Sequence, residues 1–421
     1  MTSRWLWLLS QLTRRMWFRA SLFSILAVGT ALVAIVLGPY IPSDLPTKIG
    51  ADAVDNILGI IASSMLAVTT FSLSTMVSAY SAATSNVTPR ATRLVMEDST
   101  TQNVLATFIG SFLYSLVGII ALSTGAYGST GRVVLFLVTA GVIVLIVVTL
   151  LRWIDHLSRL GRVTETTERV EKAASEAMRM RCKRPHMGGR AMTAIPKAAR
   201  PIYASRIGYV QHLDIGQLSH IAEEGEGVIF VRSTPGAFVV PTDPIAWANG
   251  LDLDEQESEI RACFTIDDIR SFDQDPRFGT SVLAEIASRA LSPGINDPGT
   301  AIDVIGRAVR ILAIWAEPVD PEQDIPFPRV HVSAIDLGEI FDDLFTPIAR
   351  DGAGIVEVGI RLQKALKALS RLGPSNFTEN AVRHSRLALE RAEASLTLQQ
   401  DIDVLRRLSE DVECTQVGPA T

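Results

Sequence analysis

The chain has 421 residues, 48% of them hydrophobic, and its 39 Lys and Arg stand against 45 Asp and Glu for a formal net charge of −6. The charge is unevenly spread, because residues 1–163 hold 11 basic and 6 acidic side chains whereas the remainder hold 28 and 39. A basic, apolar first part joined to an acidic second part predicts a membrane domain with a soluble domain attached. The acidic balance argues against nucleic acid as a partner of the soluble part.

Four long runs of almost uncharged residues lie in the first part of the chain. A bilayer core of about 30 Å needs about 20 helical residues to cross it. We therefore predict transmembrane spans near residues 20–40, 56–84, 103–125 and 132–153. The first run is longer than the apolar core of a usual secretory signal, so we expect it to be retained. The prediction is a four-helix transmembrane domain over residues 1–163, in contact with the lipid bilayer.

The arginines of the short connecting segments set the expected orientation, since cytoplasmic loops are enriched in Lys and Arg. Four arginines precede the first span, two follow the second, and more follow the fourth. The segment between the first two spans has one Lys against three Asp. This pattern predicts that both termini and the soluble domain are cytoplasmic.

The second span carries an unusual stripe of hydroxyl side chains. Of its eleven Ser and Thr residues between positions 56 and 85, eight fall within one arc of about 140° on a helical wheel. Phe71 is the bulky residue on that face. The eight are Ser63, Ser64, Thr70, Ser74, Thr75, Ser78, Ser81 and Ser85.

Two interpretations of this stripe stay open. Small residues at helical spacing let helices pack closely in lipid, with their hydroxyls bonded across the contact or back to the helix. Alternatively, the hydroxyls line a path for water or ions, with Phe71 as an apolar constriction. Four helices are too few to enclose a pore, so a channel would be a homo-oligomer. Arg132 and Arg152 stand at the two ends of the fourth predicted span, and the spans hold no buried Asp, Glu, Lys, Arg or His, which disfavours a proton-coupled transporter.

The loop after the second span contains Arg90 and Arg93, with Glu97 and Asp98 close behind. The simpler interpretation makes the two arginines topological anchors at the inner headgroups. The more specific interpretation places the two arginines in a cationic ring at the cytoplasmic mouth of a pore. There the neighbouring carboxylates would neutralise part of their charge.

The soluble part is predicted to be α+β. A charged helix should continue from the fourth span through Arg181 and form, over residues 164–190, a helical linker. Residues 191–250 hold short β-branched runs between turns and predict a small β-rich module. Residues 251–421 look mainly α-helical, with one long helix expected over 379–409. The fold class is thus a mainly α membrane protein with an α+β cytoplasmic domain.

One segment of the soluble part gathers polar residues around two predicted helices. The Asn-Asp-Pro-Gly-Thr run at 296–300 is typical of a helix cap, with Pro298 in the first turn. The alternative is a polar pocket for an ion or small ligand that the sequence does not identify. Its candidate residues are Asp273, Asp275, Arg289, Asn296 and Asp297.

Catalytic and metal-binding motifs are not evident in the sequence. It contains no nucleophile elbow, P-loop, HExxH or GxGxxG motif, so we expect neither enzymatic activity nor a cofactor. Cys182, Cys263 and Cys414 are far apart and without metal-ligand spacing, which predicts ordinary thiols and no metal site.

Several segments together resemble a known family. They are the four N-terminal spans, the Thr-Pro-Arg loop at 88–90, the Gly-Tyr-Val-Gln strand at 208–211 and the Arg-Ala-Leu-Ser-Pro-Gly-Ile-Asn-Asp-Pro run at 289–298. This order is similar to that of an uncharacterised family of bacterial predicted membrane proteins, domain of unknown function 2254. The resemblance implies a bacterial inner-membrane protein and supplies no activity, ligand or catalytic residue.

Two functions from different classes follow from these observations. The first is a homo-oligomeric ion channel or pore, lined by the second span and gated by the cytoplasmic domain. The second is a non-conducting membrane-anchored sensor or scaffold whose cytoplasmic domain binds a ligand or protein. The length of the hydroxyl stripe favours the channel.

Overall fold

The computed structural model describes residues 3–13, 15–37, 51–125, 129–317 and 325–414. The chain divides into two compact units. Residues 8–165 form one, which we call the helical unit. Residues 166–421 form the other together with residues 1–7, and we call it the mixed unit.

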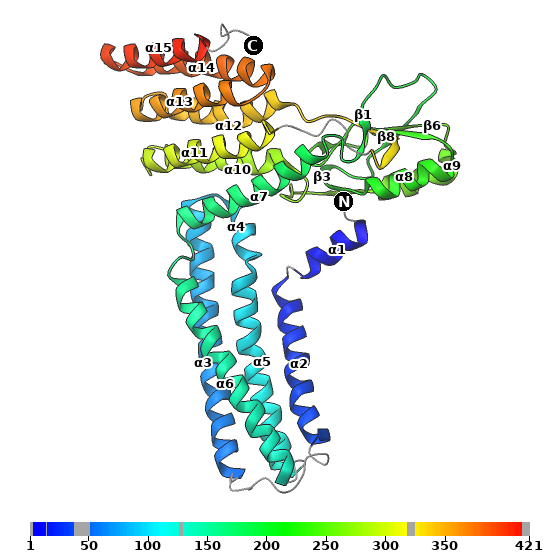
Figure 1. Cartoon of the computed structure of the whole chain (residues 1–421), viewed down its shortest axis with the longest axis vertical. Helices are drawn as coiled ribbons and strands as arrows, with labels where there is room; N and C mark the ends of the chain where they lie inside the picture. The colour runs from blue at the N-terminus through cyan, green and yellow to red at the C-terminus, as the bar shows by residue number, and fades with distance from the viewer. Residues whose placement is uncertain (1–2, 14, 38–50, 126–128, 318–324, 415–421) are drawn as a thin grey trace. The chain divides into compact units, whose positions relative to one another are not determined.

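Long helices make up the helical unit and run side by side along most of their length (Figure 1). The central one, α5, packs against α2, α3 and α6, and the short α4 follows α3 after a turn at Thr88. Their bounds are α2 Met16–Leu37, α3 Ala51–Asn86, α4 Pro89–Met96, α5 Ser99–Ser123 and α6 Ser129–Leu157.

Three of these helices are long and apolar enough to cross a bilayer. They are Ala53–Ser85, Ser99–Ser123 and Gly131–Leu157, and they coincide with the second, third and fourth predicted spans. The first predicted span falls on α2, whose described apolar stretch is the shorter Trp17–Thr30, while residues 38–40 lie outside the described residues. The structure therefore supports three spans, and the count of four stays a prediction.

Interhelical contacts in the helical unit combine apolar packing with a few buried hydrogen bonds. The Trp153 indole of α6 donates to the Ser72 hydroxyl of α3 over 2.9 Å, and both side chains are buried. Tyr114 of α5 shares a 3.0 Å hydrogen bond with Thr139 of α6. Such bonds satisfy polar groups that lipid would leave unpaired.

The helix expected to continue from the fourth span through Arg181 is in fact two helices. α6 ends at Leu157 and α7 runs from Val163 to Lys183. Between them Gly161 has φ +80°, a left-handed conformation that ends a helix. A Cβ at this glycine would lie 3.3 Å from the Ala79 backbone, so the position also requires a small residue.

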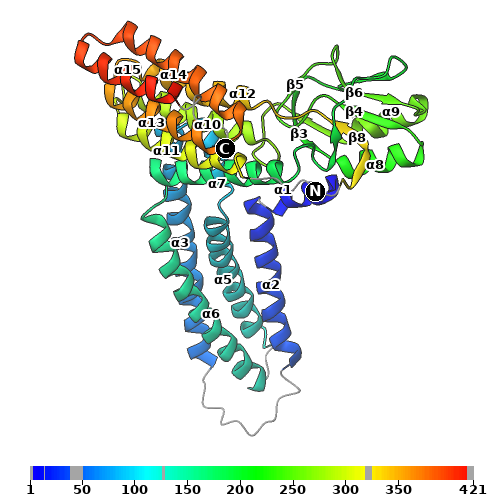
Figure 2. The same ribbon diagram turned by 45° about the horizontal axis from the view of Figure 1, so that its top comes forward.

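Two β-sheets form the sheet-containing region of the mixed unit. The five-stranded sheet has the order β1-β8-β4-β6-β2 and the three-stranded sheet the order β5-β3-β7. Helices α8 (Ile215–Glu224) and α9 (Leu253–Ala262) lie beside the five-stranded sheet (Figure 2). The strands are β1 Gly189–Ala191, β2 Arg200–Tyr203, β3 Gly208–Leu213, β4 Val228–Val231, β5 Phe238–Val239, β6 Pro244–Asn249, β7 Phe264–Asp267 and β8 Phe327–Val332.

The sheets draw on sequence well beyond the predicted module at 191–250. β7 pairs antiparallel with β3, and β8 pairs in parallel with both β1 and β4. β8 follows β4 by about a hundred residues, and the pairing buries Ile229, Val231 and Val330 in one apolar core.

The remaining helices of the mixed unit stack in pairs (Figure 1). The prediction of a single helix over 379–409 is wrong, because α14 ends at Ser395 and α15 begins at Gln399. Leu396 and Leu398, between them, have extended backbone conformations. The bounds are α10 Pro276–Ala290, α11 Pro298–Trp315, α12 Leu337–Asp351, α13 Val356–Leu372, α14 Ser375–Ser395 and α15 Gln399–Glu413.

Candidate functional site

Among the described residues, helix α3 contacts the rest of the helical unit along one face. The buried residues of that face include Val54, Leu58, Ile61, Met65 and Met76, which recur at helical spacing. Ser72 lies on the same face and receives the Trp153 hydrogen bond. This face holds the helix in its own unit and leaves the rest of its circumference uncovered.

The predicted hydroxyl stripe lies on the uncovered part of α3. None of its nine candidate residues is buried in the described part of the chain, and only Ser64 and Thr75 are even half-buried. Phe71 is 66% exposed. The exposed members are Ser63, Thr70, Phe71, Ser74, Ser78, Ser81 and Ser85. The stripe therefore does not serve packing between α3 and the described helices of its own unit.

The hydroxyls of the stripe bond to the helix that carries them. Thr70 donates to the Leu66 carbonyl over 2.9 Å, and Ser78 donates to the Ser74 carbonyl over 3.0 Å. Ser63, Ser64, Thr75 and Ser85 make the same bond one turn back. Each of these hydroxyls thereby satisfies its proton and keeps oxygen lone pairs available to a further donor.

A second exposed arc of α3 has a different chemistry. Leu66, Leu73 and Val77 are 53%, 44% and 57% exposed. At 100° per residue they cluster within about 40° of one another, between the buried face and the hydroxyl stripe. One side of α3 thus presents bulky apolar side chains and the other presents small hydroxylated ones.

The two arginines predicted at a pore mouth lie on α4 and differ in their surroundings. Arg90 is exposed. Arg93 is half-buried, and its Nε lies 2.8 Å from the Glu97 carboxylate one turn later. Glu97 therefore neutralises part of the charge of Arg93.

Sequence reasoning missed a polar cluster between α5 and α6. Asp98 caps α5 by accepting the Thr101 backbone N–H over 2.8 Å, and the Thr101 hydroxyl donates to the same carboxylate. His156 of α6 places its Nε2 2.9 Å from Asp98. The Asp-x-x-Thr spacing is a recognisable cap signal, whereas the partner on α6 has no local signature.

The five residues proposed for a polar pocket in the soluble part are not brought together. Asp275 caps the N-terminus of α10, whereas Asn296 and Asp297 follow its C-terminus. Fifteen helical residues separate the two groups by about 22 Å. Asp297 caps α11 through the Thr300 N–H, with Pro298 in the first turn, which confirms the predicted cap.

The members of this set have separate structural partners. Asp273 accepts the Trp7 indole N–H over 3.0 Å. Asp275 is buried and accepts both Arg270 nitrogens, at 2.8 and 3.0 Å. Burial raises the pKa of Asp275, and Arg270 opposes that rise. Arg289 lies in the last turn of α10, where its charge suits the helix dipole.

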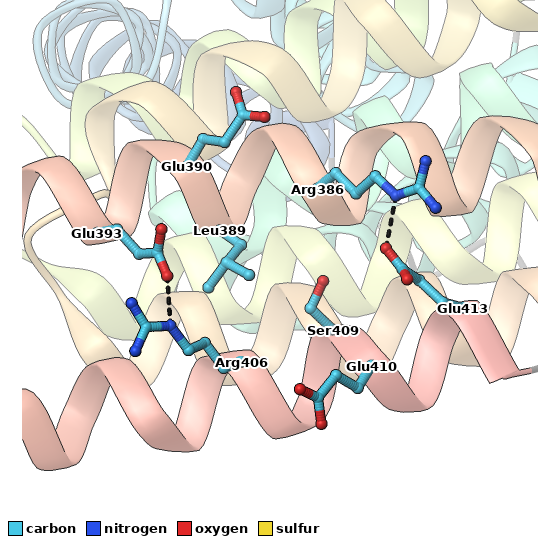
Figure 3. A pocket seen from close by; sticks show the side chains of 8 residues that line it. All are labelled: Arg386, Leu389, Glu390, Glu393, Arg406, Ser409, Glu410 and Glu413. Atoms are coloured by element: carbon cyan, nitrogen blue, oxygen red, sulfur yellow. Dashed lines mark hydrogen bonds and ion pairs between the residues drawn. The ribbon is translucent and has the colours of Figure 1, made fainter.

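A groove of about 320 Å³ lies between α14 and α15 (Figure 3). Its charges are largely paired within the groove, since Arg386 bonds Glu413 and Arg406 bonds Glu393, each over 2.5 Å. Among the described residues no group of three or more His, Cys, Asp or Glu is placed to hold a metal ion. The groove therefore offers less to a ligand than the uncovered face of α3.

Long apolar helices joined to a sheet-containing unit define a membrane protein with an attached folded domain. The chain belongs to the family described as Predicted membrane protein (DUF2254), which matches residues 13–368 and confirms the resemblance noted from the sequence. No solved structure matches the chain significantly.

Curated relatives with similar sequences come from mycobacteria. Uncharacterized proteins of Mycobacterium bovis and Mycobacterium tuberculosis are 25% identical to the chain over 257 residues. The aligned part is 58% of this chain and 49% of each relative. The chain thus spans about half the length of the curated relatives it matches.

Proposed function

We propose that the chain assembles into a homo-oligomeric channel in the bacterial inner membrane, with the hydroxyl face of α3 around the conducting path. The single observation that supports this proposal is that the described helices of its own unit leave this face uncovered. In the proposal both termini are cytoplasmic, as the arginine distribution predicts. The mixed unit gates the channel or senses the stimulus that opens it.

The contrast between the two exposed arcs of α3 favours a protein or aqueous environment for the stripe. Lipid chains are best matched by bulky side chains such as Leu66, Leu73 and Val77, which are exposed on the other arc. A face of serines and threonines offers little apolar area to lipid, but it suits a close neighbour or water. Copies of α3 arranged around an axis would give the stripe both a close neighbour and water.

Phe71 supplies the proposed constriction. Its ring is 66% exposed and projects from the same face as Thr70 and Ser74. A ring of such side chains around a narrow path would expel water and stop ion flow. Arg90, one turn beyond the end of α3, would attract anions to the cytoplasmic mouth.

The second candidate function is a non-conducting sensor or scaffold, and one observation favours it. Hydroxyls such as Thr70 and Ser78 already bond to their own helix, so they tolerate a dry contact between subunits. In this alternative the stripe would only hold the oligomer together, and the mixed unit would bind a ligand or protein.

Cysteine accessibility tests the channel against the scaffold. Cysteines at Ser74, Ser78 or Ser81 should react with small water-soluble thiol reagents in intact membranes, whereas one at the buried Met76 should not. Only a hydrated thiol ionises and reacts appreciably. Cys414 is exposed and must be replaced first. Burial raises the pKa of the Cys182 thiol to about 11 and that of Cys263 to about 12, so these two are poorly reactive.

Ion flux in reconstituted liposomes provides the second measurement. Phe71→Ser should raise basal flux, because it removes the apolar constriction. Leu73→Ser is the matched control: it makes the same kind of change on the bulky arc and should leave flux unchanged. If the stripe cysteines are as inert as Met76→Cys and Phe71→Ser stays at the empty-vesicle level, the chain is not a channel.

A further inference from the structure

The first helix of the chain, α1 (Arg4–Thr13), has two faces of opposite character. At 100° per residue, Leu6, Leu9 and Leu12 fall within one arc of about 120°. Arg4 and Trp7 fall on the other side. This is the pattern of an amphipathic helix, in which the two faces meet different surroundings.

Arg4 and Trp7 belong to the mixed unit and pack against its other residues. The Trp7 ring is buried, stacks on His212 at a centroid distance of 5.0 Å and donates its indole N–H to Asp273 over 3.0 Å. The Arg4 guanidinium donates to the Ala262 carbonyl over 2.7 Å, and its backbone N–H donates to Asp214. These contacts set the rotation of the helix about its own axis.

The leucine face is consequently left without a protein partner among the described residues. Leu6, Leu9 and Leu12 are 58%, 54% and 40% exposed. Three large apolar side chains at helical spacing make a continuous strip, which is costly to leave in water and is a frequent mark of an interaction surface.

The position of α1 in the chain limits what can cover that strip. α2 begins at Met16, three residues after α1 ends, and its apolar stretch begins at Trp17. Three residues span at most about 10 Å, so a membrane-inserted α2 holds the end of α1 at the headgroup layer.

The charge of this segment is complementary to an anionic membrane surface. The first 43 residues contain four arginines and no Asp or Glu, and two of the arginines fall directly between α1 and α2. Basic residues near the inner leaflet are attracted to its anionic headgroups. An amphipathic helix with leucines on one face and adjacent arginines is typical of a segment lying in the membrane interface.

We propose that α1 lies in the plane of the inner leaflet, with Leu6, Leu9 and Leu12 inserted among anionic phospholipids. The same helix then binds lipid on its leucine face, while Arg4 and Trp7 in its first turns pack within the mixed unit. This interaction does not depend on ion conduction and holds for a channel or a scaffold.

Depth-dependent quenching in the full chain tests this proposal. The protein, with Cys414 replaced, is labelled at a single cysteine with an environment-sensitive fluorophore and reconstituted into vesicles of mixed phosphatidylcholine and phosphatidylglycerol. The vesicles carry a nitroxide at a shallow acyl position. A label at Leu9→Cys should be quenched about threefold more strongly than one at Ser10→Cys, whose side chain points about 100° away from Leu9. Pure phosphatidylcholine should reduce that contrast.

A second labelling site guards against loss of insertion caused by the substitution itself. Leu6→Cys reports the same face while leaving Leu9 in place, and it should show the same strong quenching. Equal quenching at all three positions would overturn the proposal. So would ready disulfide formation between Leu9→Cys copies, since the strip would then be covered by a second chain. Flux measurements do not enter this test, so its failure is distinct from failure of the channel.

Discussion

The hydroxyl stripe of α3 and the mixed unit satisfy their polar side chains in different ways. On α3 of the helical unit, hydroxyls such as Thr70 and Ser78 bond to carbonyls one turn back in the same helix. In the mixed unit, charged groups reach across elements: Glu171 of α7 accepts from Arg307 and Arg310 of α11. A bond to its own backbone satisfies a polar group on a membrane helix without a neighbouring helix, whereas the ion pairs of the mixed unit join separate elements.

This difference means that polar substitutions should have unequal effects in the two units. In the mixed unit, removing one partner leaves a charge on another element unpaired. On the stripe of α3, removing a hydroxyl affects only the carbonyl one turn back that accepted its hydrogen bond, and that carbonyl still accepts a backbone N–H of the helix. Three predictions test this inequality.

The largest effect is expected at Glu171. Burial opposes its ionisation, but hydrogen bonds from Arg310 and Arg307 outweigh it and lower its pKa. Glu171→Ala would leave the buried Arg307 with Asp303 alone, and we expect a loss of about 3 kcal/mol in the stability of α7 and α11. Hydrogen exchange of these helices measures this loss of stability. Glu168→Ala, an exposed carboxylate on the same helix, should change protection little, and equal effects of the two variants would refute the prediction.

A smaller and pH-dependent effect is expected at His384. Its ring packs against Phe341 and Phe345, and burial lowers its pKa to about 4. Between pH 6.5 and 4 the unfolded chain binds a proton that the folded chain does not, so stability falls as pH falls through that window.

The loss should reach the order of 2 kcal/mol at pH 4. Hydrogen exchange or thermal unfolding measured at several pH values would show it. His384→Gln should flatten the profile between pH 6.5 and 4, whereas His220→Gln, at an exposed position, should not. A wild-type profile that is already flat there would contradict the prediction.

The smallest effect is expected on the hydroxyl stripe. Ser78→Ala should alter the stability of the helical unit by no more than about 0.3 kcal/mol, because its hydroxyl donates to a carbonyl of its own helix. Ser72→Ala, on the buried face of the same helix, removes the acceptor of Trp153 and should cost about 1 kcal/mol. Unfolding in mixed detergent micelles compares the two variants. A Ser78 variant as damaging as the Ser72 variant would place the stripe in a buried contact.

Features set by adjacent residues were predictable from the sequence. The Asp297 cap with Pro298 in the first turn depends on four consecutive residues, and it is found as expected. The strand at 208–211 was likewise anticipated, and it is part of β3, Gly208–Leu213. Three of the predicted spans follow from the length of their apolar runs alone.

Features that depend on distant residues were not predictable in the same way. The parallel pairing of β8 with β4 joins residues about a hundred positions apart, and neither strand encodes its partner. The proposed polar pocket failed because residues near in sequence sit at the two ends of α10. The break at Gly161 was overlooked because one glycine in a charged run is a weak signal until its close approach to Ala79 is seen. The structure was also needed to decide whether the hydroxyl stripe packs against the helices of its own unit.

The stacking of Trp7 on His212 has a consequence for the order in which the chain folds during synthesis. The ribosome makes Trp7 before its partner, which follows 205 residues later. At bacterial elongation rates this interval is roughly 10–40 s. Helices α2, α3, α5 and α6 are made in that interval, before His212 exists. The contact that fixes Trp7 therefore forms only after these helices have been made, and until then α1 must be held in some other way.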